Sequence, residues 1–301
     1  MQTNEVQWWR IINATVHRGK GAYICNFNKA GNEGVNIAFR QIAQDGVQFH
    51  QTNYASQITT PPTNFLLGPA NRVDILVKAP STPGTATLTG TGDTILTVNV
   101  VSGSGCNTAW PDATNFPKQP AFLGDITSIS ETRHLKYQME GRGTTPMIND
   151  KTFEENRIDE SMLLGTKQEW IIENYSTAAL AGSPLHPFHI HINPFQILEV
   201  FDPTGSLNSV LSFNSAQFGV WGKVQFPAPG RFVLPAPWVW WDTFPLPLAK
   251  DANTPGYIRF RTWFTDFAGK FVDHCHILAH EDRGMMQLIE VVDNKTIYQH
   301  R

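Results

Sequence analysis

Hydrophobic and polar positions alternate along several short segments of the chain. Within residues 257–264, Ile258 and Phe260 take one set of alternate positions, and Arg259 and Arg261 take the other. A period of two places these sets on opposite faces of an extended strand. The same pattern predicts further strands at Val6–Ile12 and at residues 72–77 and 94–101, with Gly, Pro, Asn and Asp between them.

No long segment carries the apolar repeat of an amphipathic helix. We expect only short helices or turns, at residues 36–43 and 278–282. The chain of 301 residues has 20 Pro, 23 Gly and only 16% charged residues, a balance that favours strands joined by many turns. The sequence therefore predicts an all-β protein.

A segment rich in Gly, Pro, Asn and Ser divides the chain. We expect a first domain at residues 1–102, a linker at 103–118 and a second domain at 119–301. A weak repeat joins the two parts, because Trp9 precedes Asn13 by four residues as Trp170 precedes Asn174. About a hairpin of chain precedes the second copy but not the first, so we expect the first domain to lack its initial strands and the chain to be a piece of something longer.

Charge and hydropathy exclude several classes of protein. The net charge is −3, from 23 basic and 26 acidic residues, which argues against a binder of nucleic acid or of anionic membranes. No window approaches the roughly 18 consecutive apolar residues of a membrane span. The N-terminal sequence lacks the layout of a signal peptide.

The chain has three cysteines, too few for a disulfide scaffold. Cys25 and Cys106 are either a disulfide pair or two ordinary thiols, and the sequence leaves both readings open. Cys275 differs, because it lies between His274 and His276.

Six of the ten histidines fall in two short clusters. The first reads H-P-F-H-I-H and contains His186, His189 and His191; the second reads H-C-H-I-L-A-H-E-D-R-G-M and contains His274, Cys275, His276, His280 and Met285. On an extended segment His274 and His276 point to one side and Cys275 to the other, so one strand can supply two different sites.

A thiolate, two imidazoles and a thioether are the ligands of a blue-copper site, and Cys275, His186, His280 and Met285 supply them. The remaining histidines of the clusters suit a second, all-imidazole centre. Zinc also accepts Cys and His, but six histidines, one cysteine and a correctly spaced methionine favour copper. Spacing favours Met285 over Met286 as the axial ligand.

The paired motifs H-P-x-H-x-H and H-C-H-x3-H-x4-M resemble the C-terminal signatures of multicopper oxidases, the laccase and bilirubin-oxidase family. The flanking segments NPFQILEV, WWDTFPLP and TDFAGKFVDHCHILAHEDRGMM agree. WWRIINAT, QIAQDGVQF and GPANRVDILV resemble the middle domain of that family. The resemblance implies two cupredoxin-like Greek-key β-sandwich or barrel domains, the first without a copper motif.

The resemblance also implies a role for each ligand. The type 1 copper would be held by His186, Cys275, His280 and Met285, the type 2 copper by His189, and the type 3 pair by His191, His274 and His276. In such enzymes a small donor, of the phenol or amine class, gives single electrons at the histidine that matches His280. They pass along Cys275 to the trinuclear site, where dioxygen is reduced to water. Glu281 matches an acid that is thought to assist proton delivery in spore-coat-type laccases; the alternative is an ordinary solvated acid.

Four of the eight histidines of the family's trinuclear site are missing from this sequence, because the H-W-H-G and H-x-H motifs of the first domain do not occur. The chain resembles the middle and last domains, and another chain or domain would have to supply the rest. Two-domain laccases carry all four motifs, and copper nitrite reductases lack the His-Cys-His arrangement. Two hypotheses therefore stand: part of an oxidase, or a non-catalytic blue-copper electron-transfer module. Family resemblance implies a secreted or periplasmic location.

Overall fold

The computed structural model of the protein describes residues 1–15, 23–103, 108–140, 145–179, 185–205, 207 and 225–293. In the first part of the chain the elements are β1 (Val6–Ile12), β2 (Tyr23–Lys29), β3 (Ala38–Gln44), β4 (Val47–Gln48), α1 (Gln51–Thr59), β5 (Phe65–Leu67), β6 (Arg72–Lys78), β7 (Gly84–Gly90), β8 (Asp93–Val100) and the 3-10 helix η1 (Ala121–Leu123). The second part contains β9 (Glu131–Glu140), β10 (Thr145–Ile148), β11 (Glu160–Leu163), β12 (Lys167–Asn174), β13 (Pro187–Ile190), β14 (Phe195–Phe201), β15 (Gln225–Ala228), β16 (Arg231–Val233), β17 (Trp240–Trp241), β18 (Thr243–Pro245), β19 (Gly256–Trp263), β20 (Gly269–Cys275), α3 (Leu278–Glu281) and β21 (Met286–Val292).

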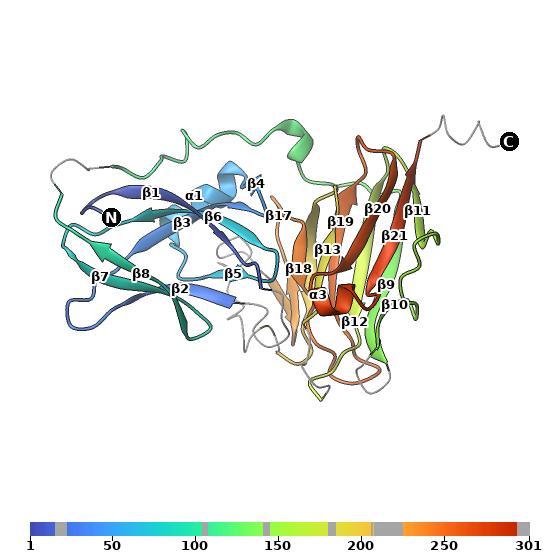
Figure 1. The fold of residues 1–301 in the computed structure, drawn as a ribbon. Helices are drawn as coiled ribbons and strands as arrows, with labels where there is room; N and C mark the ends of the chain where they lie inside the picture. The colour runs from blue at the N-terminus through green and yellow to red at the C-terminus, as the bar shows by residue number, and fades with distance from the viewer. Residues whose placement is uncertain are drawn as a thin grey trace.

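Strands dominate the structure and form four sheets, which confirms the predicted all-β class. Strands β1 to β8 form two four-stranded sheets, in the orders β1-β6-β3-β4 and β5-β2-β7-β8. Strands β9 to β21 form an eight-stranded sheet, β10-β9-β12-β19-β14-β16-β15 with β17 against β14, and a five-stranded sheet, β11-β21-β20-β13-β18. The blue and cyan strands of the first group lie beside the yellow and red strands of the second, and a green segment joins them (Figure 1).

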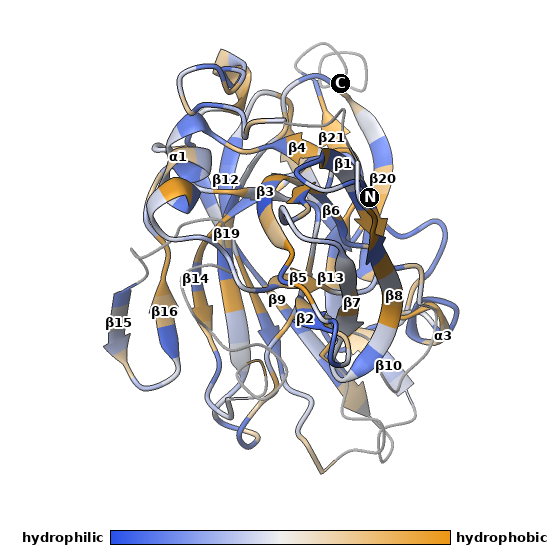
Figure 2. Ribbon diagram, turned by 90° about the vertical axis from the view of Figure 1, so that its left-hand side faces the viewer, coloured by the Kyte–Doolittle hydropathy of each residue, from blue (hydrophilic) through white to orange (hydrophobic). Residues whose placement is uncertain are grey.

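Each pair of sheets encloses a hydrophobic core. Hydrophobic and hydrophilic bands alternate along strands such as β19 (Figure 2), as expected when one face of a strand is buried. The first core lies between the strands of the N-terminal half. The second core includes Phe49 and Leu66 of the N-terminal half among its buried residues. The two halves therefore share apolar packing.

The two copies of the weak sequence repeat also form the same hydrogen bonds. Asn13 Nδ2 donates to the Leu67 carbonyl at 2.8 Å, and Asn174 Nδ2 donates to the Leu246 carbonyl at 3.3 Å. In both copies the asparagine Oδ1 accepts the backbone N–H two residues later, at 3.0 Å from Thr15 and at 2.9 Å from Ser176. β1 and β12 are thus equivalent strands.

The equivalent strands differ at one edge. β12 lies between β19, which is antiparallel to it, and β9, which is parallel. Among the described strands, β1 pairs only with β6. The side of β1 that matches the β9 side of β12 is therefore open, and the neighbouring Trp8 and Ile12 are 64% and 58% exposed.

The sequence-based elements agree with the structure except at one place. Strands were expected at the positions of β1, β6, β8 and β19, and all four are present, with a short helix at α3. The expected helix or turn at residues 36–43 is wrong, because most of that segment is β3, which pairs with β6. Its alternating buried residues, Phe39 and Gln41, fit a strand with one face in the core.

Cys25 is buried, but Cys106 lies outside the described residues, so the question of their pairing lies outside them too. In the described part of the chain, no helix has the length and apolar character needed to cross a bilayer.

We predict that the chain self-associates, or is only marginally stable, unless a partner covers the open edge of β1, since an exposed strand edge is a template for pairing. Sedimentation velocity over a range of concentrations measures this association. Trp8→Lys should shift the distribution towards monomer, whereas Ile58→Lys, at an exposed position on α1, should not. A wild-type chain that is a clean monomer with a sharp, high thermal transition would contradict the prediction.

Glu199 is a buried carboxylate on β14. It accepts hydrogen bonds from Arg231 at 2.7 Å, from the Tyr257 hydroxyl at 2.6 Å and from Arg259 at 3.0 Å. Burial raises the pKa of Glu199, but these three donors outweigh burial and hold its pKa at about 2. The free energy of unfolding should therefore fall by about 2 kcal/mol in Glu199→Gln at neutral pH.

The stabilisation by Glu199 depends on pH in a defined direction. An unfolded Glu titrates at about 4.3, so the contribution is complete above that pH and is lost as the pH falls towards 2. Urea unfolding at pH 7, 4 and 3 should show the difference between wild type and Glu199→Gln shrinking as the pH falls. Glu33→Gln, at an exposed loop position, is the matched control. A difference that is constant with pH would exclude the carboxylate as its cause.

Candidate metal centres

Two adjacent strands bring the histidine clusters together. β13 pairs antiparallel with β20, with Phe188 opposite Cys275 and His189 opposite His274. The side chains of neighbouring positions point to opposite faces of the sheet. The pairing therefore creates two sites, one on the Cys275 side and one on the His274 side.

The first site consists of Cys275, His186 and His280, all of which are buried. Cys275 Sγ lies 3.5 Å from His186 Nδ1 and 3.7 Å from His280 Nδ1. The two Nδ1 atoms are 3.2 Å apart. One sulfur and two imidazole nitrogens thus converge on one point, as the sequence predicts.

Met285 follows α3 in sequence, and its backbone is hydrogen-bonded to two residues of this site. Its carbonyl accepts the Cys275 N–H at 3.0 Å, and its own N–H donates to the His280 carbonyl at 2.9 Å. The Met285 side chain is completely buried, in the same core as Cys275. Met286, the alternative axial ligand, is the first residue of β21 and pairs with His274.

A hydroxyl orients one of the imidazoles. Ser176 Oγ lies 2.9 Å from His186 Nε2, and both residues are fully buried. Because Nε2 is engaged by the serine, Nδ1 faces the sulfur. The His186 carbonyl also accepts the Leu246 N–H at 2.9 Å, which fixes the backbone of this residue.

Burial sets the protonation of the first site. It lowers the pKa of His186 well below its ordinary value, and the nearby His280 lowers it further. Burial raises the pKa of the Cys275 thiol. The imidazole is therefore neutral at pH 7 and ready to accept a metal, whereas the thiol loses its proton when a metal binds. A soft thiolate with two imidazoles, as in Cys275, His186 and His280, fits copper.

The second site contains the other four histidines of the two motifs. The ligand atoms of His189, His191 and His274 lie within 4.8 Å of one another. His191 Nε2 and His274 Nε2 are 3.2 Å apart. The His276 ring lies 5.4 Å from that of His189 and 5.3 Å from that of His274, measured between centroids. All four predicted residues are therefore brought together.

The four imidazoles of the second site are neutral at pH 7. Burial lowers the pKa of His189 to about 4 and that of His274 to about 3. It also lowers the pKa values of His191 and His276. Uncharged imidazoles with converging nitrogens can bind metal ions without first losing protons.

Glu281 lies beside the second site. Its Oε2 atom is 3.1 Å from His274 Nδ1, although it follows His280 of the first site in sequence. Burial raises the pKa of Glu281, and the neighbouring Asp282 raises it further. This carboxyl group is thus better able to hold a proton than an exposed glutamate.

A carboxylate-rich network behind His189 was missed by the sequence analysis. His189 Nδ1 donates to the Asp242 carbonyl at 2.8 Å. The Asp242 side chain pairs with Arg72, and its N–H donates to Asp45 at 3.2 Å. Asp45 directly follows β3 and Arg72 is the first residue of β6, but no local pattern links either residue to Asp242, which is 197 and 170 residues away in sequence.

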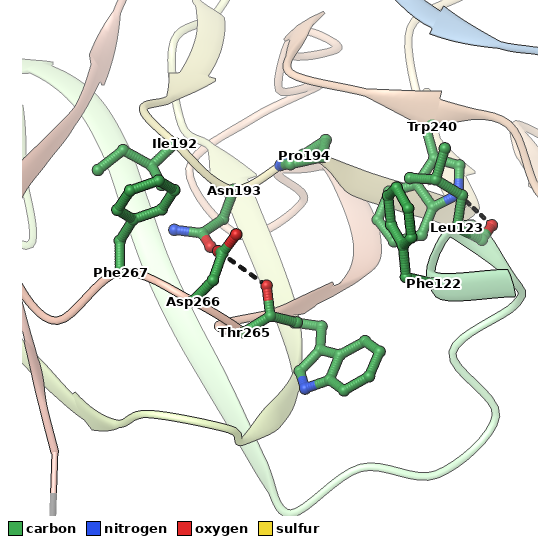
Figure 3. A pocket seen from close by; sticks show the side chains of 10 residues that line it. Phe122, Leu123, Ile192, Asn193, Pro194, Trp240, Thr265, Asp266 and Phe267 are labelled. Carbon is green, nitrogen blue, oxygen red and sulfur yellow. Dashed lines mark hydrogen bonds between the residues drawn. The ribbon is translucent and has the colours of Figure 1, made fainter. Parts of the chain in front are cut away.

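An apolar cavity of about 490 Å³ opens next to the second site. Figure 3 shows Ile192 and Phe267 at one end of this cavity and Phe122 at the other. These three side chains are 51%, 59% and 67% exposed. Ile192 directly follows His191, which is also exposed. An exposed apolar surface therefore lies next to His191, an exposed member of the histidine cluster.

Comparison with known proteins agrees with this geometry. Residues 115–295 match the sequence model of a family described as multicopper oxidase. A laccase of Bacillus subtilis is 24% identical over 306 residues, which is 95% of this chain and 50% of that protein. The multicopper oxidase mco of Staphylococcus haemolyticus is 28% identical over 160 residues, 52% of this chain and 27% of that protein.

Solved structures of similar fold cover almost the whole chain. A multicopper oxidase from Campylobacter jejuni, described as a metallo-oxidase, has a TM-score of 0.61 at 22% identity and covers 97% of this chain and 54% of its own. A multi-copper oxidase from Pseudomonas parafulva has a TM-score of 0.66 at 14% identity, covering 97% of this chain and 57% of its own. These likenesses confirm the cupredoxin-like fold. The chain spans about half the length of the B. subtilis laccase and of these solved structures.

Proposed function

The chain belongs to the multicopper oxidase family, and from this premise we propose that it forms the donor-oxidising part of a laccase-like enzyme. Copper bound at the first site would take single electrons from a phenolic or amine donor, and copper at the second site would reduce dioxygen to water. The observation that carries this proposal is the position of Cys275. Its side chain faces His186 and His280, while the flanking His274 and His276 belong to the other cluster.

We assign the copper ligands to the residues that the two sequence motifs predict. His186, Cys275, His280 and axial Met285 would form the type 1 site, His189 would bind the type 2 copper, and His191, His274 and His276 would bind the type 3 pair. The short contacts around Cys275 Sγ, the burial of Met285 and the neutral imidazoles support this assignment. The Cys275 backbone is the covalent link between the two sites.

Glu281 would hold a proton for the reduction of dioxygen. Its carboxylate lies 3.1 Å from His274 Nδ1, and its raised pKa keeps a proton available nearer to neutral pH than an exposed glutamate would. Both features support a role in proton delivery over that of an ordinary solvated acid.

The second site requires histidines from outside this sequence. The exposed His191 and the apolar surface of Ile192, Phe122 and Phe267 form an open face. We propose that a further cupredoxin-like domain or chain docks on this face and completes the cluster. By resemblance to its family, the complete protein would act outside the cytoplasm, in the periplasm or as a secreted enzyme.

One observation favours a second function for the chain by itself. Among the described residues, four histidines gather at the second site, half the number that the family uses. Without a partner the chain would be a blue-copper module that carries electrons but does not reduce dioxygen. The buried first site needs no residue from outside.

We predict about one type 1 copper per chain after copper loading of the isolated protein, since its site is complete and buried. Elemental analysis and the thiolate-to-copper charge-transfer absorption measure this. Cys275→Ser should abolish the absorption, whereas Cys25→Ser, at another buried cysteine, should keep it. No copper and no absorption would contradict the type 1 assignment. About four copper ions per chain would show a completed cluster and favour the oxidase over the module.

We predict that oxygen uptake with a phenolic or diamine donor requires the docking partner. The isolated, copper-loaded chain should be inactive in an oxygen-electrode assay. The matched control for His276→Gln is His134→Gln, at an exposed position on β9. If the isolated chain consumes oxygen, and this activity is lost in His276→Gln but kept in His134→Gln, the chain is not a non-catalytic electron-transfer module. Inactivity with every donor, even with the missing domain supplied, would contradict the oxidase.

A further inference from the structure

Asp242 lies where the two halves of the molecule meet, directly before β18. Arg72 of β6 binds its carboxylate with two hydrogen bonds, Nη1 to Oδ1 at 2.8 Å and Nη2 to Oδ2 at 2.6 Å. Such a bidentate pair fixes both distance and orientation, because the guanidinium is planar. The N-terminal half thereby holds a residue of the other half in one position.

Asp45 reinforces this contact from a fully buried position. Its Oδ2 accepts the Asp242 N–H at 3.2 Å, and its Oδ1 accepts the Arg72 N–H at 2.9 Å. Its carbonyl accepts Arg72 Nη2 at 2.7 Å. Asn71 Nδ2 donates to both Asp45 oxygens at 3.0 Å and to the Thr243 carbonyl at 2.9 Å. The backbone around Asp242 is therefore anchored on both sides.

The anchored backbone determines the state of one histidine. A carbonyl oxygen can only accept a hydrogen bond, so the 2.8 Å contact with the Asp242 carbonyl places the proton of neutral His189 on Nδ1. Thr243 Oγ1 lies 2.9 Å from the same Nδ1 and 3.0 Å from Asp242 Oδ1, and can accept from the first and donate to the second. The Nε2 lone pair of His189 is then free for a metal.

We propose that Arg72 and Asp45 are positioning residues for the metal centre in the other half of the chain. They hold Asp242 so that its carbonyl fixes the ring orientation and the Nδ1–H tautomer of His189. This inference rests on the proposed function, because that function makes His189 a copper ligand. The orientation and the tautomer of His189 are properties of the metal-free protein, so they can be tested without copper.

The chain contains a matched control for this network. Arg10 pairs with Asp74 on the adjacent β1 and β6, with contacts of 2.6 and 2.7 Å that have the same bidentate form. The Arg10 pair lies within the N-terminal half and does not contact Asp242. Losing either pair removes one arginine–aspartate interaction, but only the Arg72 pair leads to His189.

Two-bond proton–nitrogen NMR of metal-free, histidine-labelled protein distinguishes the two tautomers of each imidazole, and His189→Gln assigns the His189 signal. Wild type and Arg10→Gln should both show His189 as the Nδ1–H tautomer. Arg72→Gln should show a mixture of tautomers, with Arg72→Lys between the two. If Arg72→Gln does not fold, Asp242→Asn gives the same test, because it keeps the carbonyl and the side-chain size but removes the charge that binds Arg72.

Copper(II) titration in the Cys275→Ser background provides the second measurement, because the thiolate of the first site no longer competes and the four imidazoles of the incomplete cluster should bind copper(II), though more weakly than the type 1 site. Arg72→Gln should weaken this binding at least about tenfold, as expected for the loss of a group that orients a ligand. An unchanged His189 tautomer in both Arg72→Gln and Asp242→Asn, or an Nε2–H tautomer in wild type, would overturn the inference. A tautomer that is fixed as Nδ1–H in wild type and in Arg10→Gln but disturbed in Arg72→Gln, together with no type 1 absorption in the copper-loaded wild type, would support the positioning and contradict the proposed function.

Discussion

Both candidate metal centres depend on the antiparallel pairing of β13 with β20. The register places Phe188 opposite Cys275 and His189 opposite His274. Because side chains alternate between the two faces, a shift of one residue would move every ligand of the pairing to the wrong side of the sheet. The register is held by apolar burial, since Phe188 and Ile190 are almost completely buried in the large core. The same packing that stabilises the domain therefore sets the geometry of the ligands.

In both candidate centres, burial keeps imidazole side chains uncharged. Burial disfavours the charged form of each imidazole, so the lowered pKa values of His186, His189 and His274 follow from the core around them. The cost is a buried thiol at Cys275, whose raised pKa opposes the thiolate until a metal is present. The affinity for a metal thus depends on the metal–ligand bonds that form and on the free energy needed to remove the proton from the Cys275 thiol.

The local part of this architecture could be predicted from the sequence, and the long-range part could not. The strands at β1, β6, β8 and β19 follow from alternating residues, and the ligands lie in two short motifs with defined spacing. The segment at residues 36–43 was assigned wrongly because Gln41 is a polar residue in the core, where its side chain donates hydrogen bonds to the Ala43 carbonyl and to Gln44 Oε1. The contacts of Asp242 with Asp45 and Arg72 have no local signal, since they join segments that meet only after folding.

Within the described residues, the two copies of the repeat share one scaffold, and the second copy carries the candidate metal centre. Asn13 and Asn174 make the same pair of hydrogen bonds, and each positions a hydroxyl residue two places later. In the second copy that hydroxyl, on Ser176, meets His186. In the first copy Thr15 Oγ1 is buried and has no hydrogen-bond partner among the described residues. The asparagine turn is therefore a structural element common to both halves, and the hydroxyl became part of a metal site only where a histidine faces it. The N-terminal half contacts the second candidate centre by another route, because Arg72 binds Asp242, and the Asp242 carbonyl accepts a hydrogen bond from His189.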